Sequence, residues 1–214
     1  YCGSYDNNIY ALSASKGEFL WKFPTEGGIT SKPLVDNGLI YFGSQDGKLY
    51  AVSAKNGKLV WDFATSGPIR GSARMAEGHI FVGSDDNSLY AINTASYRKS
   101  WEISTEGAIR STPYIQSGLI YFGNEASEFI CADFRGQIKW RFNARRANTS
   151  SPIVIDGIAY FSSLDGNFYA LDAKSGWVIW RFRMGKGSIS SPCAVENMIF
   201  VGSADNYIYC LDKS

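Results

Sequence analysis

The stretch YFGSQDGKLYAVSAKNGKLVWDF, residues 41–63, combines two turn signals with alternating apolar positions and a tryptophan. Its dipeptides Asp46–Gly47 and Asn56–Gly57 are typical of tight hairpins, because Asn, Asp and Gly tolerate positive φ. Between them, apolar and polar residues alternate with period two, the pattern of short β-strands. The stretch therefore predicts antiparallel strands joined by tight turns, and the last strand carries Trp61.

The same pattern recurs through the whole chain of 214 residues. Its tryptophan returns every 39 or 40 residues, at Trp21, Trp61, Trp101, Trp140 and Trp180. The repeats cover 1–40, 41–80, 81–120, 121–159 and 160–199, and a partial sixth covers 200–214. One unit holds four alternating runs, ITSKPLVD, GLIYFGS, KLYAVSA and KLVWDF, and no helical periodicity. Four strands in every repeat of this length are typical of propeller blades.

The predicted fold class is therefore all-β: a β-propeller of four-stranded antiparallel blades, with about five repeats plus a partial sixth. We expect four complete blades from Ile29 to Phe182. The N-terminus should supply the end of a second strand, a third and a fourth, and the C-terminus a first, second and third. A five-bladed ring would pair Ser188–Asp212 with the strand around Phe19–Phe23, whereas six blades would leave two incomplete.

The repeat resembles that of the quinoprotein (PQQ-like) propellers, which is WD40-like in its blade length. The shared pattern is Y-x-G-S-x-D-G-x-L-Y-A-L-x-A-x-x-G-x-x-x-W-x-F, and YFSSLDGNFYALDAKSGWVIWRF in the fifth repeat matches it best. Such repeats also form the bacterial outer-membrane assembly propeller and sensor domains attached to kinases. The resemblance implies blade docking by the five repeated tryptophans, a usual ring of eight blades and an extracytoplasmic location.

Residues 1–214 are expected to form a single propeller domain. The chain opens on YCGS, inside an expected strand, without an initiator Met or a secretory leader. Together with the usual eight blades, this start indicates a piece of a longer protein or a small atypical propeller.

Composition narrows the classes of partner. The chain has 21 basic and 20 acidic residues, a formal net charge of +1, so no overall charge attracts it to nucleic acid. No apolar run reaches the roughly 18 residues of a membrane span. We expect no nucleic-acid partner and no membrane span, while the oligomeric state is left open.

The chain offers few residues for metal or covalent chemistry. Its four cysteines, Cys2, Cys131, Cys193 and Cys210, have no zinc spacing and are expected to be ordinary core thiols, and His79 is the only histidine. Five aspartates recur at one position, Asp6, Asp46, Asp86, Asp165 and Asp205, but each loop offers a single acid, unlike a calcium loop. We predict hairpin turns there, with no metal site and no catalytic residue.

Quinone enzymes of the resembling family are expected to hold calcium with Glu, Asn and Asp, to use a catalytic Asp, and often to carry a vicinal cysteine pair. This sequence has no Cys-Cys pair, and its repeats are not interrupted by such a site. Five equivalent tryptophans suit packing between blades better than one flat ligand, because each buries on the order of 200 Å². Trp177 lies outside that column and is expected to be exposed.

Functional residues are sought where the repeats differ. The loop between the tryptophan strand and the next innermost strand carries five cations in total, Arg70, Arg110, Arg145, Arg146 and Lys186. Equivalent loops of a propeller meet at one mouth of the central channel, so these cations predict a site for an anion or an acidic peptide. The competing interpretation is that they are solvated and paired with Glu26 and Glu106 of the same loops.

The predicted function is a non-enzymatic scaffold or binding module that presents its loops to a protein or peptide partner, without a cofactor. The irregular third and fourth repeats, with NTASYRKSW and NEASEFI, are expected to belong to the contact surface. One alternative is a small-ligand sensor or quinone-dependent oxidoreductase domain that binds pyrroloquinoline quinone with calcium. Another is a purely structural set of blades within a larger protein.

Overall fold

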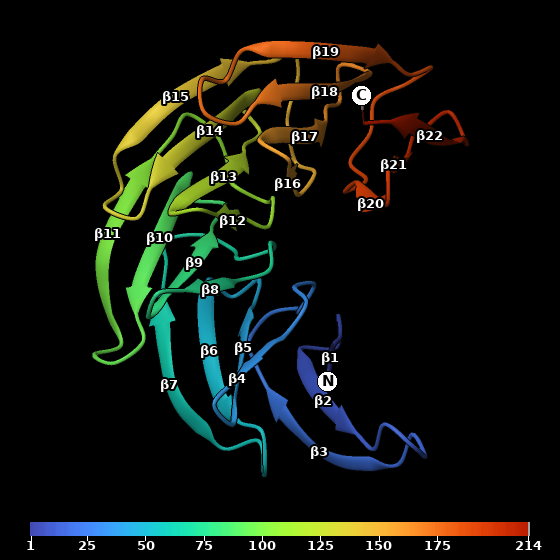
Figure 1. Cartoon of the computed structure of the whole chain (residues 1–214). Coiled ribbons are helices and arrows are strands. Elements are labelled where there is room, and N and C mark those ends of the chain that lie inside the picture. Colours follow the sequence, from blue (N-terminus) through green and yellow to red (C-terminus); the bar gives the residue numbers. More distant parts are fainter. Residues whose placement is uncertain (214) are drawn as a thin grey trace. The chain divides into compact units, whose positions relative to one another are not determined.

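The computed structural model describes residues 1–213, which form antiparallel β-sheets joined by turns and loops (Figure 1). Its contacts divide the chain into two compact units, Tyr1–Ser104 and Thr105–Ser214, called here the N-terminal and the C-terminal unit. Each is described by itself.

The N-terminal unit contains one sheet of three strands followed by two sheets of four. The first sheet consists of β1 (Cys2–Gly3), β2 (Asn8–Leu12) and β3 (Phe19–Pro24). The second consists of β4 (Leu34–Asp36), β5 (Leu39–Gly43), β6 (Lys48–Ser53) and β7 (Leu59–Ala64). The third consists of β8 (Arg74–Ala76), β9 (His79–Gly83), β10 (Ser88–Asn93) and β11 (Arg98–Ser104).

The C-terminal unit contains two sheets of four strands followed by one of three. The first comprises β12 (Tyr114–Gln116), β13 (Leu119–Gly123), β14 (Glu128–Asp133) and β15 (Ile138–Asn143). The second comprises β16 (Ile153–Ile155), β17 (Ile158–Ser162), β18 (Asn167–Asp172) and β19 (Val178–Arg183). The third comprises β20 (Cys193–Val195), β21 (Met198–Gly202) and β22 (Ile208–Asp212).

These sheets confirm the predicted fold class, an all-β propeller of four-stranded antiparallel blades. The six sheets are numbered along the chain and are called here the first to the sixth blade. The four complete blades and the two incomplete ones at the ends contain the strands that the repeat predicts. The strand around Phe19–Phe23 pairs with β2, and β22 pairs with β21 among the described strands. The two incomplete end sheets are therefore those that the six-blade alternative describes. The five-blade pairing of Ser188–Asp212 with Phe19–Phe23 would join the two units and stays a prediction.

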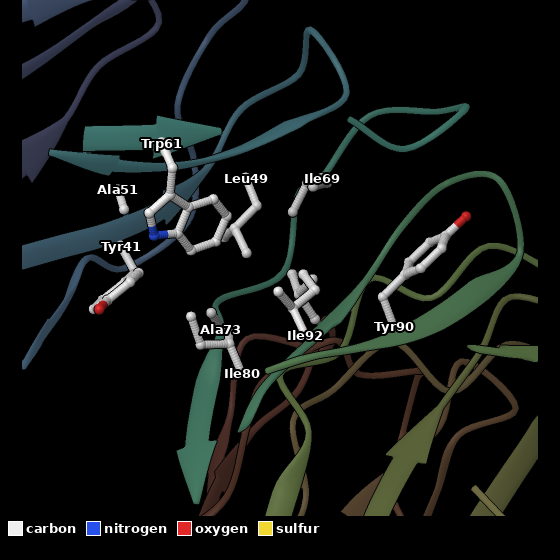
Figure 2. Packing of buried hydrophobic residues seen from close by; sticks show 10 residues of the cluster. Tyr41, Leu49, Ala51, Trp61, Ile69, Ala73, Ile80, Tyr90 and Ile92 are labelled. Atoms are coloured by element: carbon white, nitrogen blue, oxygen red, sulfur yellow. The ribbon is translucent and has the colours of Figure 1, made fainter. Parts of the chain in front are cut away.

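Neighbouring blades pack face to face within each unit. Between the second and third blades, Trp61, Leu49 and Ile69 lie in one buried cluster with Ile80 and Ile92 (Figure 2). In a complete blade the two middle strands are buried on both faces, as in β5 and β6. The outermost strand is more exposed. Continuous apolar runs therefore belong to the middle strands.

A β-bulge recurs where the tryptophan faces a small residue. In the second blade, Ala51 pairs with Trp61, and the register then shifts so that Val52 pairs with Leu59. The same shift occurs in every described sheet that has a tryptophan strand. In the fourth blade the small partner of Trp140 is Cys131. A small side chain leaves space for the indole above it, which explains the Ala/Cys column.

Two of the tryptophans, Trp21 and Trp140, lie on the turn of the following sheet. The Trp21 indole N–H donates to the carbonyl of Ala54 at 3.2 Å, and its ring lies directly against Gly57. Trp140 repeats both contacts, with Ala173 at 3.1 Å and with Gly176. Sequence reasoning assigned these glycines only to turns, yet they are also the surface on which the preceding tryptophan lies.

The repeated aspartates link each hairpin to the loop of the preceding blade. Asp86 accepts hydrogen bonds from the backbone N–H of Ser88 at 3.0 Å, from the Tyr90 hydroxyl at 2.8 Å and from the Ser66 N–H at 2.9 Å. The same three kinds of bond recur at Asp46, Asp165 and Asp205. The carboxylates therefore serve the fold, and the Asp-x-x-x-Tyr spacing was the sequence signal for it.

The expectation that all four cysteines are core thiols is wrong for three of them. Cys131 is buried, whereas Cys2, Cys193 and Cys210 are exposed. These three lie in the incomplete end sheets, where Cys210 has no tryptophan strand opposite it. Trp177 is 79% exposed, as its place outside the tryptophan column predicts.

Candidate functional site

The two cations at equivalent loop positions, Arg70 and Arg110, each lie in an ion pair. Arg70 Nε is 2.8 Å from a carboxylate oxygen of Asp85, and Arg110 Nη1 is 2.8 Å from a carboxylate oxygen of Glu125. Both partners belong to the hairpin of the blade that follows, rather than being Glu26 and Glu106 of the loops. Part of the charge of both arginines is therefore compensated locally.

The other three predicted cations, Arg145, Arg146 and Lys186, lie in two loops of the C-terminal unit. Arg145 and Arg146 follow β15, and Lys186 follows β19, the last strands of neighbouring four-stranded sheets (Figure 1). All three residues are exposed.

One cavity between these loops, called here the loop cavity, has a volume of about 400 Å³. It is lined by Arg146, Leu164, Asp165, Gly166, Arg183, Lys186, Gly187 and Ala204. Three of these side chains are cationic and one is acidic. The loop cavity therefore brings together two of the five predicted cations, Arg146 and Lys186.

A second cavity of about 350 Å³, called here the arginine cavity, is lined by Arg145, Asn167, Arg181 and Arg183. The comparison of loops between repeats did not include Arg181 and Arg183, because both lie on a strand, β19. A signal for them existed, since the two positions are Asp62 and Ala64 in the second repeat and Glu102 and Ser104 in the third. Only the fifth repeat has two cations there.

Asp165 lines the loop cavity, and its carboxylate oxygens already accept hydrogen bonds. One oxygen accepts from the backbone N–H and the side-chain amide of Asn167, at 2.8 and 3.0 Å. The other accepts from the Tyr169 hydroxyl at 2.7 Å and the Arg145 N–H at 3.2 Å. Burial opposes ionisation, but these hydrogen bonds outweigh it and lower the pKa of Asp165 below 3.8. The carboxylate is thus ionised at neutral pH.

Tyr169 stays a donor in this arrangement. Burial and the hydrogen bond to Asp165 raise the pKa of Tyr169 to about 12. The hydroxyl keeps its proton at neutral pH and stabilises the carboxylate. The Asp165–Tyr169 pair therefore holds the hairpin beneath the cations, and neither group is poised to exchange a proton near neutral pH.

The fourth repeat, irregular in sequence, replaces this pair by another polar network. Glu128 accepts from Arg141 at 2.5 Å and from the Asn124 side chain at 2.7 Å. Its backbone N–H donates to the Asn124 side chain at 2.9 Å. In the third repeat, where Tyr97 replaces the turn glycine, its ring lies 5.0 Å from that of Trp61. Both irregularities thus have local structural roles.

An apolar cavity of about 520 Å³ lies at the last sheet of the C-terminal unit. Its lining includes Leu164, Ile189 and Gly202. In the N-terminal unit the equivalent glycines, Gly3 and Gly43, are covered by an isoleucine of the loop that leads to the next sheet, Ile29 and Ile69. The cavity therefore lies where such an isoleucine packs in a complete pair of blades.

Within residues 1–213, no group of three or more His, Cys, Asp or Glu side chains is arranged to hold a metal ion. The same residues contain no helix of the length and hydrophobicity needed to cross a membrane. The chemistry available in the two basic cavities is recognition of negative charge through charge-assisted hydrogen bonds.

Comparison with known proteins places the repeat in a familiar context. The PQQ-type family described as "Outer membrane protein assembly factor BamB" matches residues 131–214. This match and the structural similarity below confirm the resemblance to PQQ-like repeat propellers. A curated protein, the beta-alanine-activating enzyme of Danio rerio, is 42% identical over 40 residues, which are 19% of this chain and 4% of that protein.

Solved structures share the fold. BamB from Moraxella catarrhalis superimposes with a TM-score of 0.83 at 18% identity, over 98% of this chain and 65% of that chain. The computationally designed Ika8 protein superimposes with a TM-score of 0.87 at 12% identity, over 98% of this chain and 66% of that one. The chain thus spans just under two thirds of the length of both, and at these identities the likeness concerns the fold.

Proposed function

We propose that the chain is a non-enzymatic binding module whose loop cavity receives an acidic segment of a protein or peptide partner. The observation that carries the proposal is the charge around that cavity. Arg146, Arg183 and Lys186 line it, and its one carboxylate, Asp165, is already engaged by four hydrogen bonds. Such a cavity favours a ligand that brings its own negative charge.

Backbone hydrogen bonds that fix the two loops support this function. The loop after β15 is held by the Arg145 N–H on Asp165, and the loop after β19 by the Ser188 N–H on the Ser163 carbonyl at 3.1 Å. The backbone of a loop fixed in this way loses little freedom when the loop binds, so less of the binding energy is spent on ordering it. The name of the matching family, an assembly factor, agrees with a role in protein association.

We also propose that the module works without a cofactor. The quinone alternative needs a calcium site made by several oxygen ligands, and the Asp column that could supply carboxylates instead bonds to Tyr hydroxyls and backbone N–H groups. These residues do not fit a calcium-bound quinone. The 40-residue match to an activating enzyme concerns too little of that protein to favour catalysis.

The proposal predicts that reversing two loop charges weakens binding of an acidic peptide. A fluorescently labelled hexaglutamate peptide is titrated with the protein and followed by anisotropy, at low and at moderate salt. We expect saturable binding that weakens as salt rises, since the contacts are between exposed charges. The double variant Arg146→Glu, Lys186→Glu should weaken binding at least about tenfold, because charge-assisted contacts are replaced by repulsion.

The matched control is Arg135→Glu, which reverses an exposed arginine in a turn of the same unit that lines neither basic cavity. It should bind the peptide like the original chain. Equal binding by the double variant would show that the loop cavity is not the site. Saturable thermal stabilisation by pyrroloquinoline quinone with calcium would favour the sensor or oxidoreductase alternative instead.

A further inference from the structure

The arginine cavity concentrates positive charge that the described part of the chain does not neutralise. We propose that it is a binding site for a phosphate monoester, held by Arg145, Arg181 and Arg183. The arginine cavity shares Arg183 with the loop cavity, but its other two cations are Arg145 and Arg181 instead of Arg146 and Lys186. The phosphate site therefore goes beyond the proposed function, and the variants that test it are different.

The first argument is the difference between blades. In the second blade, Asp62 follows the tryptophan and lies 3.5 Å from Lys48 on the neighbouring strand. In the fourth blade, Arg141 occupies that position and pairs with Glu128 at 2.5 Å. In the fifth blade the residue is Arg181, and it faces Tyr169.

The partner position across from Arg183 is also neutral in the fifth blade, since it is occupied by Asn167. In the second and fourth blades the equivalent residues are the charged Lys48 and Glu128. Among the described residues, none of Arg145, Arg181 and Arg183 has a carboxylate oxygen within ion-pair distance of its guanidinium. The compensation present in two other blades is therefore missing here.

The second argument is that the site is already organised. Arg183 Nη1 donates to the carbonyl of Asp165 at 2.6 Å, and the guanidinium lies over Gly166 at the tip of the hairpin. The Asn167 amide is held by Asp165 at 3.0 Å and by the Tyr169 hydroxyl at 3.2 Å. The backbone of Arg145 is bonded to the same Asp165. Arg183, Asn167 and the backbone of Arg145 are therefore already held in place before an anion enters.

The third argument concerns which anion fits. Three guanidiniums around about 350 Å³ supply a charge of +3 and many N–H donors in planar forks. A phosphate monoester carries a charge between −1.5 and −2 at neutral pH and offers three strong acceptor oxygens. A carboxylate offers one negative charge and two oxygens, which leaves more of the site's charge uncompensated. The exposed side chains leave the cavity accessible from solvent.

The test is a titration of the purified chain with inorganic phosphate, observed by ³¹P NMR line broadening at constant ionic strength. We expect saturable binding. Arg181→Gln and Arg183→Gln should each weaken it at least about fivefold, because each removes a charged donor pair. The matched control is Lys22→Gln, since Lys22 is exposed, occupies the position of Arg181 in the first blade and lines neither basic cavity. This control should bind phosphate like the original chain.

Arg181→Asp guards against a simple folding defect, because the second blade already carries an aspartate at this position. It should keep the thermal unfolding midpoint and lose phosphate binding. No saturable binding, or equal weakening in Lys22→Gln, would overturn the proposal. Succinate binding as tightly as phosphate would also overturn it, because the site would then bind any dianion and not the phosphate group in particular.

Two further probes identify the source of the phosphate group. A Gly-phosphoserine-Gly peptide and glycerol phosphate are compared with the unphosphorylated peptide. Tighter binding of the phosphopeptide than of glycerol phosphate supports a protein-borne ligand, and equal binding supports a small phosphorylated molecule. Equal binding of the unphosphorylated peptide contradicts the site. Because hexaglutamate binding is tested with Arg146 and Lys186 variants, failure of either proposal can be recognised separately.

Discussion

Gly57 has two roles in the second blade, and each excludes a side chain for its own reason. Its φ is +68°, a region that L-residues with a Cβ adopt at a cost. A Cβ added there would also lie 2.5 Å from the ring of Trp21. The glycine thus permits the turn and lets the tryptophan of the preceding blade approach the backbone closely.

Gly57→Ala should therefore destabilise the chain by about 2–4 kcal/mol, the sum of a positive-φ penalty and an overpacked contact. Chemical denaturation followed by tryptophan fluorescence measures the change. The matched control is Gly38→Ala, because Gly38 has a φ of +76° and open space around its Cβ position. It should cost only about 1 kcal/mol. Equal losses in both variants would mean that the Trp21 contact contributes nothing.

The repeat predicted the glycine at this position but not its contact with Trp21. Gly57 and Trp61 are four residues apart in one repeat, whereas the indole on Gly57 comes from the repeat before. Such a contact depends on how neighbouring blades stack, which a pattern within one repeat does not contain.

At the level of elements, the hairpin between the second and third strands is held by its aspartate. Asp165 joins β18 to the loop after β15, and the equivalent acids do the same in the second, third and sixth sheets. The hydrogen bonds keep the pKa of Asp165 below its ordinary value of 3.8 in the folded chain. Folding is therefore favoured by this group while it is ionised.

The sign of the pH dependence follows from that shift. A group with a lowered folded pKa stabilises the fold above its unfolded pKa and loses this contribution as the pH falls through the folded pKa. Asp165→Asn should lower the unfolding free energy by about 1–3 kcal/mol at pH 7, because bonds to a charged acceptor are lost. The difference from the original chain should shrink as the pH falls below 3.8.

Thermal unfolding measured across this pH range tests the prediction. Asp156→Asn is the control, because the Asp156 side chain is 81% exposed and lies 3.5 Å from Lys213 in one ion pair. It should change stability little at any pH. A difference for Asp165→Asn that stays constant into acid would contradict a role for the ionised carboxylate.

At the level of the whole molecule, each repeat ends its strands at equivalent positions, so a copy of one repeat can follow another. Asp212 ends β22 at the position where Ser53 ends β6. A copy of residues 54–93 joined after Asp212 would therefore continue the pattern. It would supply a tryptophan strand beside β22 and place the copied Ile69 at the apolar cavity beside Gly202, as Ile69 packs on Gly43.

The extended chain should unfold at a higher temperature, because Tyr207 and Ile208, now 67% and 79% exposed, become covered. Stacked repeats stabilise one another through such interfaces. Changing the copied isoleucine to aspartate is the control and should remove much of the gain, about 2 kcal/mol for one buried isoleucine. Calorimetry that resolves a separate transition for the added repeat, with the original midpoint unchanged, would contradict the packing.

The sequence by itself determined the blades. A tryptophan every 39 or 40 residues, Asp-Gly turns and period-two runs specify four strands per repeat, because backbone pairing and turn geometry depend on residues close together in the chain. It also pointed to Arg145, Arg146 and Lys186 through their difference from equivalent loops. Local pattern was sufficient wherever the relevant contacts lie within one repeat.

Only the tertiary structure decided which cations are compensated. Arg70 and Arg110 find Asp85 and Glu125 in the following hairpin, whereas Arg145 meets Arg181 and Arg183 around one cavity. A charge is compensated by opposite charges that lie close to it in space. Residues about 15 to 40 positions apart in the chain become such neighbours only when the sheets stack. Composition could not separate these outcomes, since both kinds of arginine count equally toward a net charge of +1.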